Sequence, residues 1–219
     1  SAAAMWAANA ATISPPFDSA DGKVHFTPAN LTAKVHRSIE ASTTARALKT
    51  IFHDSRFFTH HDPLPFGSHF SDEGAANHSR FCRCYGEKGV QLFVWGKSSL
   101  LQEGQEPRRF PARQTLEASQ AIARRHRLDQ ANVVFAQQNP AAIDAGVFHN
   151  DVIAIANEHF LLFHQEAFLD ENNVLDELCR KVEQTCNTHL IKMRVDSDQI
   201  SLMDAVATYL FNSQIVSLP

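Results

Sequence analysis

The sequence predicts an α/β protein built from repeated modules of two strands, a helix and a returning strand. Strand-like apolar runs alternate along the chain with segments of helical spacing, in an order that indicates two strands, a helix and a returning strand, repeated. Only 8 glycines occur, without the glycine fingerprint of a dinucleotide-binding fold. A cyclic array of ββαβ modules, with strand ends and loops converging on a central site, fits this order of elements.

In the first module, strands are expected at Ala7–Ile13 and Val24–Thr27, on either side of a turn-rich segment. A helix is expected to begin near Thr43, a residue type that favours the N-cap position. Pro63 and Pro65 mark the loop that follows. The apolar residues expected on one face of this helix are Ala47, Leu48, Ile51 and Phe52.

In the second module, Val90–Trp95 is rich in β-forming side chains and predicts a strand. The polar stretch Lys97–Arg109 predicts a surface loop. A helix over Arg113–Leu128 then leads into a strand at Asn132–Gln137. The residues at helical spacing on its inner face are Leu116, Ser119, Ile122, Ala123 and His126.

The third module begins with strands at Val152–Ala156 and Phe160–His164, joined by the tight turn Asn157-Glu158. A helix over Asn173–Cys186 and a strand over His189–Val195 complete it.

Beyond the third module, a helix is expected over Ser201–Phe211, with Ser201 as its cap, and a further strand begins at Gln214–Val216. The chain starts at a serine rather than a methionine and stops directly after this run. Both ends therefore look truncated.

The composition narrows the class of protein. A hydrophobic content of 44% and a charged content of 20% are ordinary for a soluble globular domain. The net charge of −4, without a block of like charge, gives no sign of a nucleic-acid or membrane surface. Apolar stretches such as Val152–Ala156 are too short to cross a bilayer.

The cysteines and histidines give no metal or disulfide signature. Cys82, Cys84, Cys179 and Cys186 form neither a disulfide framework nor a Cys-x-x-Cys pair, which fits a reducing compartment such as the cytoplasm. His60-His61-Asp62 is the densest patch among 12 histidines, but no His-Glu-x-x-His or facial-triad spacing accompanies it. We therefore expect no metal site.

His149 and Asp151 are the first candidates for chemistry. The apolar run Val133–Phe135 stops at the polar residues and proline of Gln138-Asn-Pro140, and His149 and Asp151 come after the next turn. They are two residues apart, a spacing that lets both side chains face one pocket. A histidine can exchange protons near neutral pH. The alternative is a buried histidine that bonds a backbone carbonyl, and the sequence leaves both open.

Glu73 is the second candidate, in the cluster Asp72-Glu-Gly-Ala-Ala-Asn-His78. The small residues after it would let a ligand approach the backbone. The alternative is a capping cluster at a helix start, where acidic residues are favoured. Arg37 and Arg113 could bind carboxylates through their guanidinium forks. Asn9, a polar amide in an apolar run, needs a backbone or ligand partner.

Seven motifs, in order along the chain, resemble N-succinylarginine dihydrolase, a family of guanidino-group-modifying enzymes. The resemblance runs nearly end to end and covers the middle half of the family's length. The motifs are Met5-Trp-Ala-Ala-Asn9-Ala-Ala-Thr-Ile-Ser-Pro15, His36-Arg-Ser-Ile-Glu40, Asp72-Glu-Gly-Ala-Ala-Asn-His78, Pro111-Ala-Arg-Gln-Thr115, Phe135-Ala-Gln-Gln-Asn-Pro140, Gly146-Val-Phe-His-Asn-Asp-Val-Ile-Ala154 and Thr208-Tyr-Leu-Phe-Asn-Ser-Gln214.

The resemblance implies a pentein fold, an α/β-propeller of ββαβ modules, of which residues 1–219 would form an incomplete portion of a single catalytic domain. It implies hydrolysis of N-succinyl-L-arginine to N-succinyl-L-ornithine, carbon dioxide and two ammonia molecules in arginine catabolism, without a cofactor. Glu73 and His149 take the family's acid/base positions, and Glu73 and Asp151 would orient the guanidinium. The substrate-contacting positions fall on Asn9, His36, Arg37, Arg113 and Asp151.

The family's nucleophilic cysteine lies beyond Pro219, so we expect this chain alone to be inactive. A thiolate would attack the guanidinium carbon to form a covalent adduct. The expected partner is the small-molecule substrate, with neither nucleic acid nor membrane, and a homodimer is left open. The alternatives are a deiminase or amidinotransferase of the same fold, an inactive fragment, or a metal-binding or purely structural chain.

Overall fold

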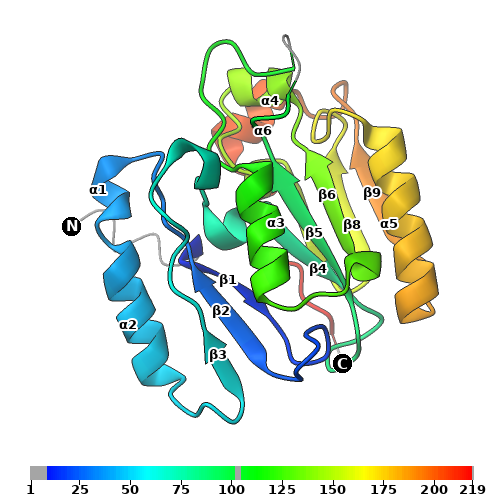
Figure 1. Cartoon of the computed structure of the whole chain (residues 1–219). Coiled ribbons are helices and arrows are strands. Elements are labelled where there is room, and N and C mark those ends of the chain that lie inside the picture. Colours follow the sequence, from blue (N-terminus) through cyan, green and yellow to red (C-terminus); the bar gives the residue numbers. More distant parts are fainter. Residues whose placement is uncertain (1–8, 102–104, 219) are drawn as a thin grey trace.

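The computed structural model describes residues 9–101 and 105–218 and contains three small three-stranded sheets (Figure 1). Each sheet is built in the same way. Its first two strands pair antiparallel, and its third strand returns after a helix and pairs parallel with the second. The predicted order of two strands, a helix and a returning strand is therefore confirmed, and the chain is an α/β protein.

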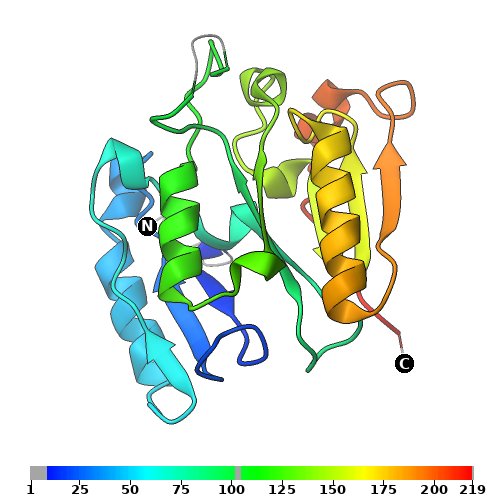
Figure 2. The same cartoon turned by 45° about the vertical axis from the view of Figure 1, so that its right-hand side comes forward.

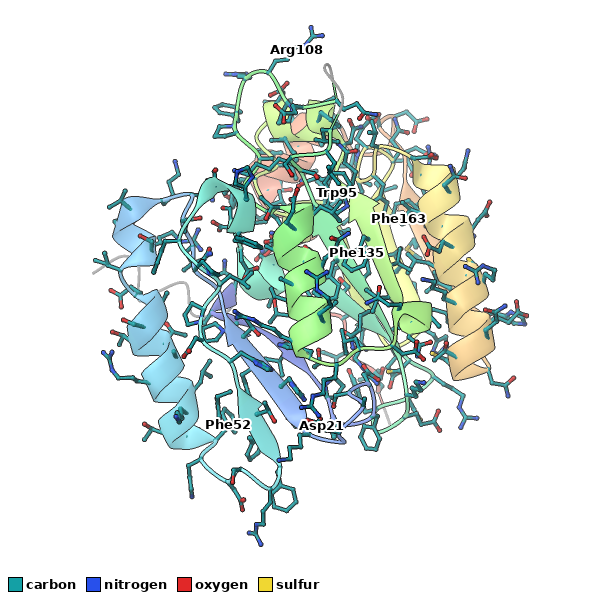
Figure 3. All side chains as sticks on the ribbon, viewed as in Figure 1. Asp21, Phe52, Trp95, Arg108, Phe135 and Phe163 are labelled. Carbon is teal, nitrogen blue, oxygen red and sulfur yellow. The ribbon has the colours of Figure 1, made fainter. Side chains whose placement is uncertain are left out.

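The first sheet packs against α2 at one side of the molecule (Figures 1 and 2). Phe26 of its central strand stacks on Phe52, which directly follows α2, with 4.9 Å between the ring centroids. Figure 3 labels Phe52 beside this sheet. The elements of this module are β1 (Ala11–Ser14), β2 (Val24–Pro28), α1 (Val35–Ser38), α2 (Ala41–Ile51) and β3 (Phe58–His60).

The second sheet is central, with α3 packed on it. Thr115 caps α3, because its side chain accepts a hydrogen bond from the backbone N–H of Ala118 at 3.2 Å. The elements of this module, 3₁₀ turns included, are η2 (Ser68–Phe70), η3 (Gly74–Asn77), β4 (His78–Phe81), β5 (Val90–Trp95), α3 (Leu116–Arg125), η4 (Gln130–Asn132) and β6 (Val133–Gln137).

The long helix α5 connects β8 and β9 of the third sheet and contacts β5 and β6 of the second sheet. Asp170 caps α5, and Asn187 ends it in the left-handed conformation. The remaining elements are α4 (Pro140–Asp144), η5 (Asn150–Val152), β7 (Ala154–Asn157), β8 (Phe160–His164), α5 (Glu171–Cys186), β9 (Ile191–Val195) and α6 (Leu202–Thr208).

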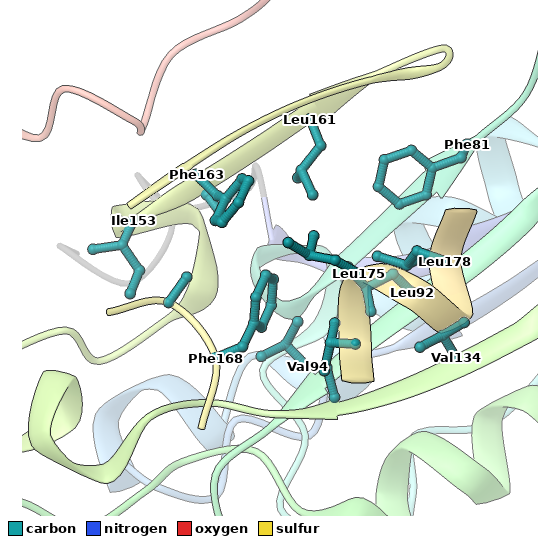
Figure 4. Packing of buried hydrophobic residues seen from close by; sticks show 14 of the residues in the cluster. Phe81, Leu92, Val94, Val134, Ile153, Leu161, Phe163, Phe168, Leu175 and Leu178 are labelled. Carbon is teal, nitrogen blue, oxygen red and sulfur yellow. The ribbon is translucent and has the colours of Figure 1, made fainter. Parts of the chain in front are cut away.

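The main hydrophobic core joins the second and third modules (Figure 4). Leu92 and Val94 of β5, Leu161 and Phe163 of β8, and Leu178 of α5 are each at most 1% exposed. Each side chain of this size contributes about 1.5–3 kcal/mol when it leaves water. This shared core fixes the turn before β4 relative to the turn before β7.

A buried polar contact joins the first and second modules. His126, the residue after α3, lies between two hydroxyls of the first sheet: its Nδ1 is 2.7 Å from the Oγ of Ser14, and its Nε2 is 2.8 Å from the Oγ1 of Thr27. Arg80 of β4 holds Asp18, in the loop between β1 and β2, through two hydrogen bonds. These contacts fix the first sheet against the second.

All four predicted helices differ from the structure in at least one bound. The helix predicted over Arg113–Leu128 is α3, Leu116–Arg125, and the helix predicted over Asn173–Cys186 begins at Glu171. The first helix, α2, begins at Ala41 rather than at Thr43, and its apolar residues do not form a fully buried face, because Ala47 and Ile51 are exposed. The predicted helix Ser201–Phe211 has its cap at Ser201 as expected but ends at Thr208.

The strands predicted near the two ends of the chain also differ from the structure. Gln214–Val216 was predicted as a strand, but it is irregular, since no neighbouring strand in the described residues supplies its hydrogen bonds. Of the predicted strand Ala7–Ile13, the first two residues lie outside the described part, and β1 begins at Ala11. None of the helices in the described ranges has both the length and the apolar composition needed to cross a membrane.

Candidate active site

The candidate site lies where corresponding turns of the three modules meet. Asn9 precedes β1, Glu73 directly precedes η3 and β4, and His149 directly precedes η5 and β7. Each module thus contributes one polar side chain from just before its first strand. The contacts of η3 with β1 and with η5 bring these turns together.

Glu73 is the buried centre of this site and is 0% exposed. Its Oε2 accepts a hydrogen bond from Arg37 Nη1 at 2.7 Å and lies 2.6 Å from His149 Nε2, while its Oε1 has no hydrogen-bond partner. Burial by itself would raise the pKa of Glu73. The hydrogen bond and charge of His149, together with Arg37, outweigh burial and lower the pKa below its usual value. Glu73 is therefore an ionised carboxylate at neutral pH.

Asp151 lies on the other side of the His149 ring. Its Oδ1 is 4.0 Å from His149 Nδ1 and accepts no hydrogen bond, and its Oδ2 accepts one from Asn212 Nδ2 at 2.9 Å. Burial raises the pKa of Asp151, against the lowering effects of His149 and Asn212. The imidazole is thus placed between two carboxylates, and one oxygen of each has no partner.

Close packing of the backbone places the turn that carries Glu73. Gly74 has φ +66°, and a Cβ at this position would lie 2.3 Å from the carbonyl oxygen of Asn9. Asn9 donates from Nδ2 to the carbonyl oxygen of Glu73 at 3.3 Å, so its partner is backbone. The interpretation of this cluster as a helix-start cap is confirmed in part: Glu73 directly precedes η3, and Asp72 Oδ1 accepts a hydrogen bond from the backbone N–H of Gly74 at 3.1 Å, but the Glu73 side chain makes no capping hydrogen bond.

Two amide side chains that sequence reasoning left without a role hold the same turn. Gln114 accepts a hydrogen bond from the backbone N–H of Glu73 at 2.7 Å and donates to Asp72 Oδ1 at 3.2 Å. Asn77 accepts one from the backbone N–H of Asn150 at 2.9 Å, which ties the turn of Glu73 to the turn of His149. Both amides occur within the motifs quoted above, yet only the three-dimensional contacts reveal what they do.

A cavity of about 630 Å³ opens beside these groups. Glu73 is not part of its lining and reaches the cavity only through His149 and Arg37. A second cavity of similar volume runs along the first strands and shares Ala75, Ala76 and Asp151 with it. The first cavity is lined by Asn9, Lys34, His36, Arg37, Ala75, Ala76, Arg113, Phe148, His149, Asp151, Tyr209 and Asn212.

The cavity contains cationic side chains suited to anions. Arg113 is half-buried, with its Cζ 4.6 Å from the centroid of the Phe148 ring, and nothing in the described residues accepts a hydrogen bond from its guanidinium. Burial lowers the pKa of Arg113, although Glu73 opposes this shift. Arg37, by contrast, is already paired with Glu73. Lys34 and His36 are exposed residues of the same lining.

The cysteines and most histidines lie away from this cavity. Cys82, Cys84, Cys179 and Cys186 are free thiols, and none of them lines it. Within residues 9–101 and 105–218, no group of three or more His, Cys, Asp or Glu side chains is placed to hold a metal ion.

The fold and the site together define an α/β protein with a repeated ββαβ topology and a buried carboxylate–imidazole–carboxylate arrangement beside a cationic cavity. A profile of the succinylarginine dihydrolase family (AstB) matches residues 1–219. The chain belongs to this family.

Named relatives agree with this assignment. The chain is 58% identical over 217 residues to N-succinylarginine dihydrolase of Marinobacter nauticus, an alignment that covers 99% of this chain and 48% of the relative. It is 55% identical over 219 residues to the enzymes of that name from Shewanella denitrificans and Aeromonas hydrophila, and these alignments cover 100% of this chain and 48% of each relative. The chain therefore spans about half the length of the curated relatives it matches.

Proposed function

We propose that the full-length protein hydrolyses N-succinyl-L-arginine to N-succinyl-L-ornithine, carbon dioxide and two ammonia molecules, with consumption of two waters. The observation that carries this proposal is the placement of His149 between the carboxylates of Glu73 and Asp151, beside a cavity with unpaired cationic donors. The names of relatives 52–58% identical to the chain support the same reaction.

The proposed substrate matches the charges of the cavity. A guanidinium offers N–H donors that suit carboxylates, and the Asp151 side chain lines the cavity and is 38% exposed. The carboxylates of the succinyl end suit the unpaired guanidinium of Arg113, with Asn9, His36 and Arg37 as further contacts. Charge complementarity therefore orients the substrate between Asp151 and Arg113.

The proposed chemistry is nucleophilic attack followed by hydrolysis. A thiolate bonds to the guanidinium carbon, and His149 gives a proton to the departing amine so that ammonia leaves. His149 then takes a proton from the water that breaks the carbon–sulfur bond and leaves a ureido group. A second round at the same carbon, with a second water, releases the other ammonia and leaves a carbamate, which loses carbon dioxide to give N-succinyl-L-ornithine. Glu73 Oε2, 2.6 Å from His149 Nε2, stabilises the protonated imidazole, and we propose that Glu73 supports the acid/base role of His149 in this way.

The thiolate would come from outside residues 1–219, since no cysteine of this chain lines the cavity. We also propose that the three sheets are part of a single propeller-like catalytic domain of the pentein type. The supporting observation is that all three sheets share one topology and present their polar residues from equivalent turns.

The test is an ammonia assay on the full-length protein with N-succinyl-L-arginine. We expect two ammonia molecules per substrate, unchanged by a chelator, and a loss of turnover of at least about a hundredfold in His149→Ala. His189→Ala is the matched control, because the His189 side chain is 89% exposed and does not line the cavity. A ratio of one ammonia per substrate would favour a deiminase, and wild-type turnover in His149→Ala would refute the role of this histidine.

A further inference from the structure

The turn after α6 forms part of the cavity wall. Within it, Phe211 is 0% exposed and packs edge-on against His164, with 6.3 Å between the ring centroids. Tyr209 and Asn212, on either side of this anchor, both line the cavity. The turn is therefore fixed to the core by one side chain and presents two others to the cavity.

Tyr209 occupies a conformation that is unfavourable for its residue type. Its φ of 53° and ψ of 35° are left-handed, a region that is unfavourable for a residue with a Cβ because the Cβ approaches the following carbonyl oxygen. This conformation ends α6 and turns the chain back, and the backbone N–H of Asn212 bonds to the carbonyl oxygen of Tyr209 at 3.0 Å. The strained residue thus sets the position from which Asn212 reaches Asp151.

Asn212 makes one side-chain hydrogen bond, from its Nδ2 to Asp151 Oδ2 at 2.9 Å. This bond occupies one carboxylate oxygen and leaves the other, Oδ1, shielded and without a partner, at 4.0 Å from His149 Nδ1. A carboxylate held at one oxygen cannot rotate freely, so the direction of its second oxygen is defined.

We propose that Asn212 is a positioning residue for Asp151, and that the turn Tyr209–Asn212 determines which carboxylate oxygen of Asp151 faces a bound cationic group. This inference rests on the proposed function only for the identity of the cation, a guanidinium. The contact between Asn212 and Asp151 is independent of that function.

The electrostatic consequence follows from the charges around Asp151. His149 faces it from the adjoining turn, and Arg37, Arg113 and Lys34 line the same cavity. A hydrogen bond to the ionised form lowers the pKa of a carboxyl, and Asn212 acts on Asp151 in this direction. Removal of the amide should therefore raise the pKa of Asp151 and leave less of its ionised form at weakly acidic pH.

The experiment uses the full-length protein with Asn212→Leu, which keeps the size of the side chain and removes its donor. With N-succinyl-L-arginine, kcat/KM should fall about tenfold to a hundredfold, the range expected for loss of a hydrogen bond to a charged group. The acidic limb of the pH profile of kcat/KM should move to higher pH. Asn212→Asp, which places a second carboxylate beside Asp151, should move the limb further in the same direction.

Ser213→Ala is the control, because Ser213 lies in the same turn, does not line the cavity and makes only a backbone contact. It should leave both readouts unchanged. The proposal is overturned if Asn212→Leu lowers only the thermal stability, or if the acidic limb stays where it is in both Asn212 variants.

A second readout requires no turnover. The ¹³C resonance of the Asp151 carboxyl, identified by its loss in Asp151→Asn, reports the titration of this group directly. A rise of the Asp151 pKa in Asn212→Leu supports the positioning role whether or not N-succinyl-L-arginine is consumed. A failure to consume this substrate would count against the proposed function alone. An unchanged titration overturns the positioning role, whatever the substrate.

Discussion

Replacement of Gly74 by alanine tests whether close backbone packing places the Glu73 turn. The chain offers a matched control in Gly22→Ala. The two glycines have nearly the same conformation, with φ +66° at Gly74 and φ +67° at Gly22. A Cβ on Gly22 would meet nothing within 4 Å, whereas a Cβ on Gly74 would lie 2.3 Å from the Asn9 carbonyl oxygen and 3.1 Å from the Ala29 Cβ.

The expected magnitudes follow from this difference. Both variants should lose about 1–2 kcal/mol of unfolding free energy, because a left-handed conformation is unfavourable for alanine. Gly74→Ala should lose about 1–3 kcal/mol more, the usual cost of overpacking, because the obstructing atom is backbone and cannot change rotamer. Asn9 must move away, and its hydrogen bond to the carbonyl oxygen of Glu73 lengthens or breaks.

The measurement is urea unfolding of the full-length protein and its two variants, together with steady-state turnover. Gly74→Ala should be the less stable variant and should also lose activity, since the turn that holds Glu73 against His149 is displaced. Gly22→Ala should keep its activity, because Gly22 does not line the cavity. Equal losses of stability in the two variants would refute the argument that the Asn9 carbonyl limits the space at this turn.

Of three further predictions, two concern groups that contact Glu73 and one concerns His78 of β4. Arg37→Met should lower the unfolding free energy by about 3 kcal/mol, and Glu73→Gln in the same protein should recover part of this loss, as a double-mutant cycle in urea would show. Gln114→Leu should lower kcat more than it changes KM in steady-state assays, because the freed N–H of Glu73 no longer fixes its turn. Burial lowers the pKa of His78 to about 4, so the unfolded chain binds this proton more readily than the folded protein does. The free energy of unfolding should therefore fall by at most about 1.4 kcal/mol per pH unit as the pH drops from about 6.5 to 4. Thermal melts of His78→Gln should lack this part of the pH dependence.

The regular elements were largely predictable from local sequence. Val90–Trp95 and Phe160–His164 have the same bounds in the prediction and in the structure, because each is a β-forming run bounded by residues that end a strand. The burial of α2, by contrast, could not be predicted from its sequence. Its apolar side chains have helical spacing, but in the described part of the chain only Ala41 of this helix is buried, so periodicity marked the helix without showing what covers it.

The sequence by itself determined the alternation of strands and helices and the family to which the chain belongs, although it did not predict β3, β4 or the short helices α1 and α4. These properties depend on short segments, in which composition and spacing act locally. His149 and Asp151 share a pocket, as their spacing of two residues predicted.

Only the tertiary structure decided how these groups act on one another. Glu73 contacts Arg37 and His149 across 36 and 76 residues of chain, and Asn212 contacts Asp151 across 61. A buried charge acquires its partners when separate modules pack together, and its pKa depends on those partners and on the loss of water. No local pattern encodes that packing, so the buried position of Glu73 and the free oxygen of Asp151 are properties of the folded chain alone.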